Sequence, residues 1–500
     1  MFNLRGNCNL SGERRKKEGG NVFGEGTKTP ITLTLLVKKP ATSGCAKIFY
    51  KDIGDYSNRV EKLSTIKRFG SILNPEMELT SITPNEDGDW INKRSKVFET
   101  FIPIGDKKNP DTKTVFVPYY SRGVASARDV WVYNFSQPEL VKNISSMIDF
   151  YNENVAIFEN AKKENPSAKP DQYIRLTSSR ISWNRGLKND YEKLKRHLYR
   201  PETLRIAMYR PFVKEHYYFD RNFNDMVYQI PRLFPTPQSK NLVICCSGNG
   251  ANTFSTIITD CVPDLHILES GTQCFPLYYY EESDNSGQRT LFDNDNNNIV
   301  RRDGLSDFIL QRCRQEFGYR ITKEDIFFYI YGLLHSKQYR QKFSADLKKM
   351  LPRIPLVKEF WAFSKAGGEL AKLHLNYENI APTDVVKIDK HSDNYTVEKI
   401  RFPQKNKKDT IIFNPYITIS NVPLRAYDYI VNGKSPIEWL MERYQLTNDS
   451  YSKIVNNPNL WCSEHGNSKY IFDLLLKLIA LSISTMDIVD SLPDISDELK

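Results

Sequence analysis

Two short motifs in this sequence carry residue types that could do chemistry. Asp264 and His266 stand two positions apart, a pairing that can perform acid–base work. Ser247-Gly-Asn-Gly250 follows an apolar run, as phosphate-binding loops do. Both patterns are incomplete, because no plausible nucleophile accompanies His266, Thr253 replaces the third glycine of a dinucleotide-binding loop, and no P-loop lysine follows. We therefore expect a structural hydrogen bond at His266 and a tight turn at residues 247–250.

Patterns that could bind metal ions are also incomplete. Residues 293–298, DNDNNN, resemble a calcium loop, but Asn298 replaces its glycine and Gly304 replaces its closing glutamate. Cys462 and His465 have a ligand-like spacing without a second pair of ligands. The eight cysteines include no C-x-x-C pair. We therefore expect reduced, mostly buried thiols and no metal site.

Asn414-Pro415-Tyr416 is one proline short of the N-P-P-Y signature of amino-methyltransferases. In that signature the Asn side chain and a prolyl carbonyl accept hydrogen bonds from the target amine, and the Tyr stacks on a flipped base. No glycine-rich cofactor strand precedes the tripeptide here. We expect it to mark the start of a strand instead.

Residues 209–235, YRPFVKEHYYFDRNFNDMVYQIPRLFP, combine eight Phe or Tyr with four Lys or Arg and three acids. Aromatic faces can pack a core or stack on bases, and basic side chains between them can hold phosphates. Composition favours a packed core whose Tyr hydroxyls are hydrogen-bonded. We expect most of these aromatic side chains to be buried, namely those of Tyr209, Phe212, Tyr217, Tyr218 and Phe219.

The composition is that of a globular protein of two or three domains, with 500 residues and 40% hydrophobic content. The net charge of +10 is compatible with a polyanionic partner. Residues 1–70 hold 14 Lys or Arg against 6 Asp or Glu, whereas residues 443–500 hold 5 against 8. The apolar run 470–486 is interrupted by Asp473 and Lys477, which predicts an amphipathic core helix and no membrane association.

The elements that must position these residues follow from hydrophobic periodicity and turn signals. Strands are expected at 31–37, where a β-branched run predicts burial, and at 47–50, 241–246, 273–280, 396–402 and 410–420. Helices are expected at 60–69, 140–160, 190–197, 321–334, 339–350, 356–375, 435–444 and 469–492. Residues 283–302 are a polar, low-complexity insertion and are expected to form a mobile loop. Strands so near the start suggest an N-terminally incomplete domain.

Several long blocks, taken in order, resemble the type ISP restriction–modification enzymes. They include FNLRGN at 2–7, YRPFVKEHYYFDRNFN from 209, GTQCFPLYYY at 271–280, ITKEDIFFYIYGLLHSKQYRQKF at 321–343 and YDYIVNGKSPIEWLMERY at 427–444. The resemblance runs nearly end to end, apart from the insertion at 283–302. It implies a sequence-specific DNA-binding protein of the cytoplasm.

The resemblance also implies the fold. Residues 1–200 would be the C-terminal part of an α/β, Rossmann-like methyltransferase sheet, and residues 201–500 a mixed α+β target-recognition domain. Complete family members join a nuclease, an ATPase motor, a coupler, an adenine N6-methyltransferase and a target-recognition domain in one polypeptide. S-adenosylmethionine is the cofactor implied for the intact enzyme. In the family its glycine-rich motif and the N-P-P-Y motif lie upstream of FNLRGN, so we expect this chain alone to bind no cofactor and transfer no methyl group.

The resemblance points to double-stranded DNA as the partner and to candidate contacts in turn-like places. Arg232, Gln238 and Lys240 stand around two prolines, and Asn249 stands in the glycine loop. Arg and Gln can contact guanine and adenine through two hydrogen bonds, while Lys suits phosphate. Phe23 resembles the family position whose aromatic ring stacks on the flipped adenine, with packing against the sheet as the alternative. Phosphates could also be held by a basic cluster, Arg14, Arg15, Lys16 and Lys17.

Three hypotheses of different class remain. The chain is the C-terminal part of a split or truncated restriction–modification enzyme that works with an upstream-encoded nuclease, ATPase and methyltransferase polypeptide. Alternatively, it is a stand-alone DNA-binding specificity module. The third possibility is an inactive remnant. Site-preferring, salt-dependent DNA binding by the isolated chain would separate the second hypothesis from the third.

Overall fold

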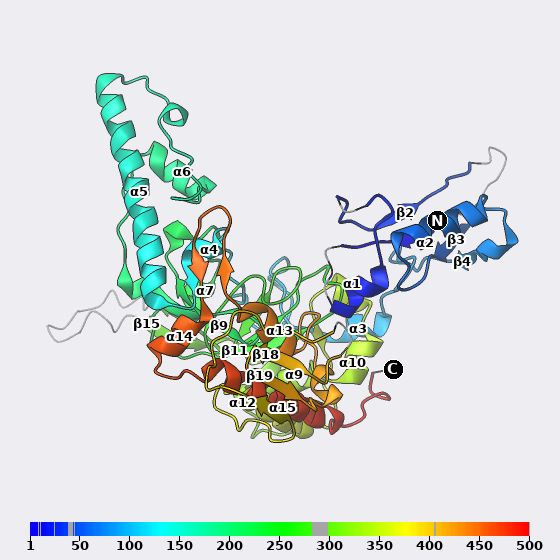
Figure 1. Cartoon of the computed structure of the whole chain (residues 1–500). Coiled ribbons are helices and arrows are strands. Elements are labelled where there is room, and N and C mark those ends of the chain that lie inside the picture. The colour runs from blue at the N-terminus through cyan, green and yellow to red at the C-terminus, as the bar shows by residue number, and fades with distance from the viewer. Residues whose placement is uncertain are drawn as a thin grey trace. The chain divides into compact units, whose positions relative to one another are not determined.

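The computed structural model describes residues 1–8, 10, 12–24, 26–38, 44, 46–282, 299–404 and 407–499. The chain forms two compact units. The N-terminal unit comprises Met1–Phe98 with Phe343–Asp346, and the main unit comprises Glu99–Lys342 with Leu347–Lys500. Both mix helices with small sheets (Figure 1). No helix in the described part of the chain is long and apolar enough to cross a membrane.

The N-terminal unit is built on one four-stranded sheet of order β2-β1-β3-β4. Strand β1 (Phe2–Arg5) pairs in parallel with β3 (Ile48–Asp52) and antiparallel with β2 (Ile31–Leu33), and β3 pairs antiparallel with β4 (Thr80–Ile82). The helices are α1 (Gly12–Glu18) and α2 (Arg59–Phe69), and a 3-10 turn covers Pro75–Met77. The core is small and consists of Phe2, Leu4, Val22, Phe69 and Met77. The helix predicted at 60–69 and the strand predicted at 47–50 are confirmed.

The prediction of a buried strand over residues 31–37 is wrong in two respects. Strand β2 ends at Leu33, and the side chains of Leu33 and Leu36 are 47% and 87% exposed. The physical reason is the position of β2 at the sheet edge, where it pairs only with β1. An apolar, β-branched run favours a strand with a buried face, but it does not specify which part of the protein buries that face.

Within its described residues, the main unit holds two four-stranded sheets, a three-stranded sheet and three two-stranded pairs. The sheet orders are β11-β10-β13-β6, β12-β8-β9-β7 and β17-β19-β18, with the pairs β14-β15, β16-β5 and β20-β21. The strands are β5 (Ile102–Pro103), β6 (Ser121–Arg122), β7 (Tyr133–Asn134), β8 (Leu204–Arg210), β9 (Val213–Tyr218), β10 (Val243–Cys246), β11 (Thr256–Thr259), β12 (Val262–Pro263), β13 (Gln273–Pro276), β14 (Tyr278–Glu282), β15 (Ile299–Asp303), β16 (Arg353–Ile354), β17 (Lys387–Lys390), β18 (Ile411–Asn414), β19 (Ile417–Ser420), β20 (Thr447–Asn448) and β21 (Val455–Asn456).

The remaining helices belong to the main unit, except that α3 and α11 cross the boundary between the two units (Figure 1). From α3 onward they are α3 (Lys96–Thr100), α4 (Asp129–Val132), α5 (Gln137–Glu164), α6 (Arg185–Glu192), α7 (Ile230–Leu233), α8 (Asp307–Phe317), α9 (Lys323–Leu333), α10 (Lys337–Lys342), α11 (Asp346–Lys349), α12 (Phe360–Leu375), α13 (Pro436–Arg443), α14 (Pro458–Glu464) and α15 (Tyr470–Asp490). The helices predicted at 321–334, 435–444 and 469–492 are confirmed as α9, α13 and α15. The helix predicted at 339–350 is instead split into α10 and α11.

The aromatic segment 209–235 lies in the core of the main unit, as its composition predicted. Phe212, Tyr217 and Tyr218 have no exposed surface. The Tyr217 ring stacks on Tyr133 with 4.3 Å between ring centroids, and its hydroxyl donates to the Asn224 side chain at 2.6 Å. These hydroxyls are satisfied by protein groups, so most of this segment forms the core rather than a DNA-binding surface.

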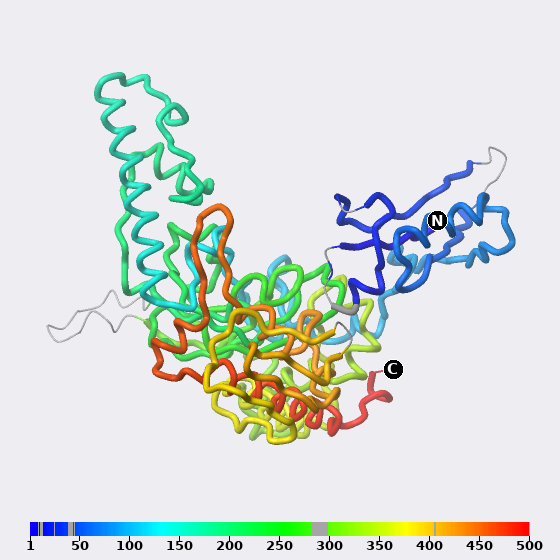
Figure 2. Tube along the Cα trace, viewed as in Figure 1, coloured from blue at the N-terminus to red at the C-terminus, as the bar shows by residue number. Residues whose placement is uncertain are grey.

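A long helical hairpin projects from the main unit. Figures 1 and 2 show α5 rising from the body and the chain returning through α6. The Ser136 side chain caps the first turn of α5. The helix predicted at 190–197 is misplaced, because Asn184 caps a helix that begins at Arg185 and Leu194 adopts a positive φ of 56°, which prevents its continuation.

Helices α9 and α12 pack at unusually short range. A Cβ atom on Gly367 would lie 1.8 Å from the backbone oxygen of Phe328, and one on Gly332 would lie 2.3 Å from that of Phe363. Only glycine permits this backbone contact.

The strand predicted at 396–402 does not form, because the carbonyls of Asn394 and Thr396 accept hydrogen bonds from the Asn414 side chain and residue 401 makes one isolated bridge.

Candidate nucleic-acid interface

Three of the candidate DNA contacts lie in one region of the main unit. Arg232 is on α7, exposed, with its guanidinium 4.8 Å from the centroid of the Tyr119 ring. Tyr119 in turn packs on Tyr279 of β14 at 4.6 Å. Gln238 and Lys240 follow in the exposed loop after α7, and the Lys240 carbonyl accepts a 2.7 Å hydrogen bond from the Tyr280 hydroxyl. The structure thus brings these three candidates beside a pair of tyrosines.

Asn241 fixes this loop to its surroundings. Its buried amide nitrogen donates to the carbonyls of Leu233 on α7 and Tyr278 on β14, at 3.0 and 2.7 Å. Its amide oxygen accepts from the backbone nitrogens of Leu242 and Tyr278. One buried side chain therefore satisfies four backbone groups and holds α7, the loop and β14 together.

Strand β15 adds two arginines to the same region. Arg301 lies 4.2 Å from the centroid of the Tyr278 ring, and the Arg302 Nε donates to Glu281 at 2.7 Å. We call this region the basic–aromatic surface; it includes both faces of the β14–β15 pair, because side chains alternate along a strand. It consists of Tyr119, Arg232, Gln238, Lys240, Tyr278, Tyr279, Tyr280, Arg301 and Arg302. Burial raises the pKa of Tyr278 to about 12, and its hydroxyl donates to Glu324 at 2.6 Å.

The arginines of β15 were missed because of the insertion that precedes them. Residues 299–302 were expected to belong to a mobile loop, and this is wrong, since β15 pairs with β14 from Ile299 to Asp303. Residues 283–298 lie outside the described part of the chain, as does the calcium-like DNDNNN run. The sequence did contain one signal for this strand pair, the run Tyr278-Tyr279-Tyr280, which favours a strand. The partner of that strand begins after the insertion.

Asn249 lies in a different loop, in which backbone N–H groups already donate hydrogen bonds to other parts of the protein. The Gly248 nitrogen donates to the Glu269 carbonyl at 3.0 Å and the Gly250 nitrogen to the Lys348 carbonyl at 2.7 Å. A Cβ on Gly248 would lie 2.2 Å from the Ser270 oxygen, so the glycine is required for packing. The expected tight turn is confirmed, and the loop has no free cradle of N–H groups for a phosphate. Asn249 itself is exposed.

The other candidates belong to the N-terminal unit. In α1 the Arg15 guanidinium donates to the Gly19 carbonyl and to the Cys8 thiol, and Lys17 lies 3.7 Å from Asp55. Part of the predicted basic cluster, Arg14 to Lys17, is therefore engaged within its own unit. The Phe23 ring is 70% exposed, which rules out the alternative in which it packs against the sheet.

The loop that carries Phe23 is held by buried polar groups. Lys62 on α2 has no exposed surface, and its ammonium donates to the carbonyls of Glu18 and Gly20 at 2.6 and 2.8 Å. The Arg59 Nε donates to the Val22 carbonyl at 3.0 Å, and Asn21 accepts from the Phe23 nitrogen at 3.0 Å. The exposed ring thus stands on a rigid base.

The weaker motifs have structural roles. Asp264 accepts from Arg210 and from the Tyr133 hydroxyl at 2.8 and 3.1 Å, and also from the backbone nitrogen of His266. The backbone hydrogen bond from His266 is the structural hydrogen bond that the sequence predicted, and the Asp264 carboxylate also raises the pKa of His266. Asn414 ends β18, and its amide oxygen accepts from the Tyr416 nitrogen, so the methyltransferase interpretation of this tripeptide fails. The expected strand start is also wrong, because the tripeptide ends one strand and forms the turn to β19. In the described ranges no three His, Cys, Asp or Glu side chains form a metal-binding group.

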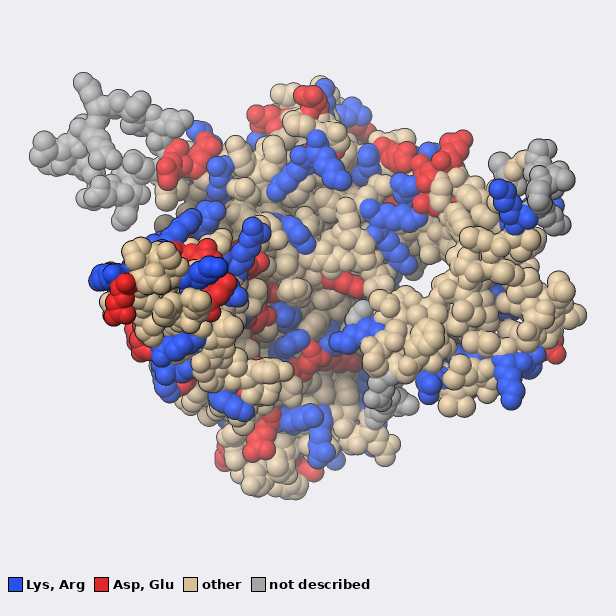
Figure 3. Space-filling view, turned by 90° about the horizontal axis from the view of Figure 1, so that it is seen from above, with Lys and Arg blue, Asp and Glu red and all other residues tan. Residues whose placement is uncertain are grey.

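Charge on the main unit is mixed rather than uniform. Figure 3 shows Lys and Arg side chains in several groups on the visible face, with Asp and Glu side chains between them. DNA affinity on such a surface would come from individual contacts more than from a broad positive field.

Comparisons with known proteins identify the family of this chain. The type ISP C-terminal specificity domain matches residues 115–474. No protein with a curated description matches the chain. The fold is similar to that of a nuclease-deletion mutant of the type ISP restriction–modification enzyme LlaGI in complex with a DNA substrate mimic, with a TM-score of 0.84, 35% identity and coverage of 99% of this chain and 43% of that chain.

Two further solved structures are similar. The ATP-dependent type ISP restriction–modification enzyme LlaBIII bound to DNA gives a TM-score of 0.84 and 34% identity over 99% of this chain and 30% of that chain. The DrdV–DNA complex gives 0.80 and 28% over 98% and 47%. The chain therefore spans less than half the length of these relatives. The domain match and the similarity over nearly the whole length of the chain show that it belongs to the type ISP restriction–modification enzymes.

Proposed function

We propose that this chain recognises a specific site in double-stranded DNA, as the C-terminal part of a cytoplasmic type ISP restriction–modification enzyme. The observation that carries the proposal is that the whole basic–aromatic surface lies within the matched specificity domain, residues 115–474. The three related structures are complexes with DNA or a DNA mimic, which supports the same partner.

The basic–aromatic surface has the groups needed for both kinds of DNA contact. Arg232 could donate two hydrogen bonds to guanine, and Gln238 could pair with adenine, in the major groove. Lys240, Arg301 and Arg302 suit phosphates, which set the register of the protein on the duplex. Cation–π contacts to Tyr119 and Tyr278 orient two of the guanidinium groups before DNA arrives. Asn249 remains a further candidate from a separate loop.

We propose that the N-terminal unit is the end of the methyltransferase sheet. A parallel β1–β3 pair with antiparallel edge strands is compatible with the last part of a Rossmann-like sheet. Phe23, exposed on its rigid loop, would stack on the flipped adenine, and the basic residues Arg14 to Lys17 would approach phosphates. The boundary between the two domains at residue 200 remains a prediction from the sequence. The two compact units divide near residue 98, and the match to the specificity domain begins at residue 115.

Adenine methylation with S-adenosylmethionine would be an activity of the complete enzyme. These 500 residues contain neither the glycine-rich cofactor motif nor N-P-P-Y, and the one glycine loop that resembles a phosphate cradle has its N–H groups occupied. The residues present do not fit the cofactor, so we derive no catalytic step from them. An upstream-encoded polypeptide with nuclease, ATPase and methyltransferase parts would be the partner in a split enzyme.

The test is binding of the purified chain to a pool of randomised DNA duplexes, followed by sequencing of the retained fraction. We expect enrichment of one short site, and a dissociation constant that rises steeply with salt. Arg232→Gln should weaken binding to the selected site by about 1–3 kcal/mol and relax preference at one base pair. Arg312→Gln on α8 is the matched control, because it removes one exposed arginine that is ion-paired with Glu316. Equal retention of all sequences would refute site recognition.

A further inference from the structure

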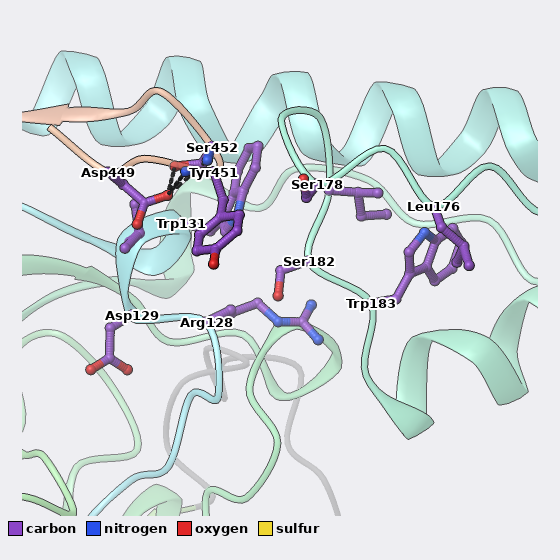
Figure 4. A pocket seen from close by; sticks show the side chains of 12 residues that line it. Arg128, Asp129, Trp131, Leu176, Ser178, Ser182, Trp183, Asp449, Tyr451 and Ser452 are labelled. Atoms are coloured by element: carbon purple, nitrogen blue, oxygen red, sulfur yellow. Dashed lines mark hydrogen bonds between the residues drawn. The ribbon is translucent and has the colours of Figure 1, made fainter. Parts of the chain in front are cut away.

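A pocket of about 390 Å³ opens between three segments of the main unit. The loop before α4 contributes Arg128, the loop before α6 contributes Ser182 and Trp183, and the β20–β21 turn contributes Tyr451 (Figure 4). The Tyr451 side chain at the rim is 75% exposed. None of these residues belongs to the basic–aromatic surface, and no sequence motif pointed to them.

Arg128 is the unusual group in this pocket. It is only 4% exposed, and all three nitrogens of its guanidinium are without a hydrogen-bond partner among the residues that the structure describes. Burial lowers its pKa to about 10, which still leaves the group charged at neutral pH. A buried cation without hydrogen bonds is destabilising, so an anion or a water molecule that accepts from this guanidinium would stabilise the protein.

The two carboxylates that line the pocket do not supply that partner. Asp129 accepts from the Tyr209 hydroxyl at 3.0 Å and lies 3.7 Å from Arg210, and Figure 4 shows its carboxylate directed away from the Arg128 guanidinium. Asp449 accepts from the backbone nitrogens of Tyr451 and Ser452 at 3.1 and 2.7 Å. Asp225 acts on Arg128 only through its charge and is itself hydrogen-bonded by Asn184.

The chemistry of the pocket fits an oxyanion. A guanidinium presents five N–H donors in a planar fork that matches two oxygens of a phosphate. Figure 4 shows the Ser182 hydroxyl directed to the same part of the pocket as this fork, which offers a further donor. Trp183 and the exposed Tyr451 provide aromatic walls that could contact the sugar and base on either side of a phosphodiester.

We propose that this pocket binds a phosphodiester group of DNA, with the Arg128 guanidinium as its main donor and the Ser182 hydroxyl as a second. The inference rests on the proposed function, because it identifies a phosphate contact of the same DNA-binding unit. A free phosphate ion has the same chemistry. The experiment must therefore distinguish binding of the free ion from binding of a DNA phosphodiester.

The test compares wild type with Arg128→Met, which keeps an apolar stem and removes the charge. Dissociation constants for the selected duplex, measured from 50 to 300 mM salt, should rise roughly ten- to a hundredfold in the variant. The slope of log K against log salt should fall by about 0.9, the value of one phosphate contact. The unfolding temperature should rise, because an unpaired buried cation has been removed. Arg128→Lys should bind DNA with intermediate affinity, and Arg312→Gln should leave the affinity unchanged.

The outcomes separate this inference from the proposed function. Equal DNA affinity and salt slope in wild type and Arg128→Met would overturn the inference and leave site recognition standing. A lower unfolding temperature of Arg128→Met would also overturn it, since Arg128 would then have a structural partner. If wild type binds no DNA, the proposed function fails. In that case a tryptophan fluorescence change with inorganic phosphate, lost in Arg128→Met, would assign the pocket to the free ion and overturn the DNA source.

Discussion

The close contact between α9 and α12 predicts opposite effects for two neighbouring glycine substitutions. In Gly367→Ala the new methyl would stand 1.8 Å from the Phe328 oxygen and 2.7 Å from the Gly332 nitrogen. Both are backbone atoms, so the clash is relieved only by moving one helix against the other. In Gly368→Ala the nearest atom is the Phe328 ring carbon at 3.9 Å, an ordinary van der Waals contact.

The magnitudes follow from helix propensity and overpacking. Replacing glycine by alanine inside a helix favours the folded state by roughly 0.8–1 kcal/mol. Overpacking a close-packed interface costs typically about 1–3 kcal/mol, and a clash with backbone lies at the upper end. Gly368→Ala should therefore stabilise the main unit by up to about 1 kcal/mol, and Gly367→Ala should destabilise it by about 1–2 kcal/mol after the propensity gain.

The assay is urea unfolding followed by tryptophan fluorescence and by far-ultraviolet circular dichroism. Since the chain has two compact units, the two probes must give the same transition for the main unit before midpoints are converted into free energies. A Gly367→Ala variant as stable as Gly368→Ala would show that α9 and α12 are not in backbone contact, and would refute the reasoning.

Two further predictions concern buried ionisable groups. Burial raises the pKa of Glu215 to about 7 from 4.5, so stability from its neutral form is complete below about pH 4.5 and is lost as pH rises through about 7. Glu215→Gln should abolish that decline, roughly 3 kcal/mol in all, in thermal unfolding between pH 4.5 and 7.5; an unchanged pH profile would contradict it. Lys62→Met should release the carbonyls of Glu18 and Gly20 and make residues 19–24 the first site of limited proteolysis. Lys67→Met, on the exposed face of the same helix, is the control, and identical cleavage rates in the two variants would rule out the proposed role of Lys62.

Local patterns were sufficient where the structure depends on neighbours in sequence. The helix predicted at 140–160 is present as α5, because both its apolar spacing of three to four residues and its Ser136 cap depend only on neighbours in the sequence. The burial of Phe212 and Tyr217 followed from their density of aromatic neighbours. Strand β15 could not be predicted from its own residues, because Arg301 and Arg302 acquire a strand partner only through Tyr279 and Tyr280, across the insertion.

The candidate DNA-contact residues differ in the same way, because some can be predicted from local sequence and others depend on distant parts of the fold. Arg232, Gln238 and Lys240 could be selected because prolines mark an exposed turn, and exposure is a local property. Arg128 carries no such mark, since its burial depends on a loop some fifty residues later and a hairpin near residue 450. A sequence pattern gives no indication that a single arginine lacks a partner, because this depends on which distant carboxylates the fold places elsewhere.

The anchoring by Asn241 has a consequence for how specificity could change among related proteins. The exposed residues between Phe234 and Asn241 are attached at one end to α7, whose Ile230 and Leu233 are buried, and at the other to a side chain that satisfies four backbone groups. Substitutions between these anchors leave the core unaltered. If Arg232, Gln238 and Lys240 read the bases as proposed, we expect that exchanging this segment between family members would transfer base preference, provided that Asn241 and the length of the loop are retained.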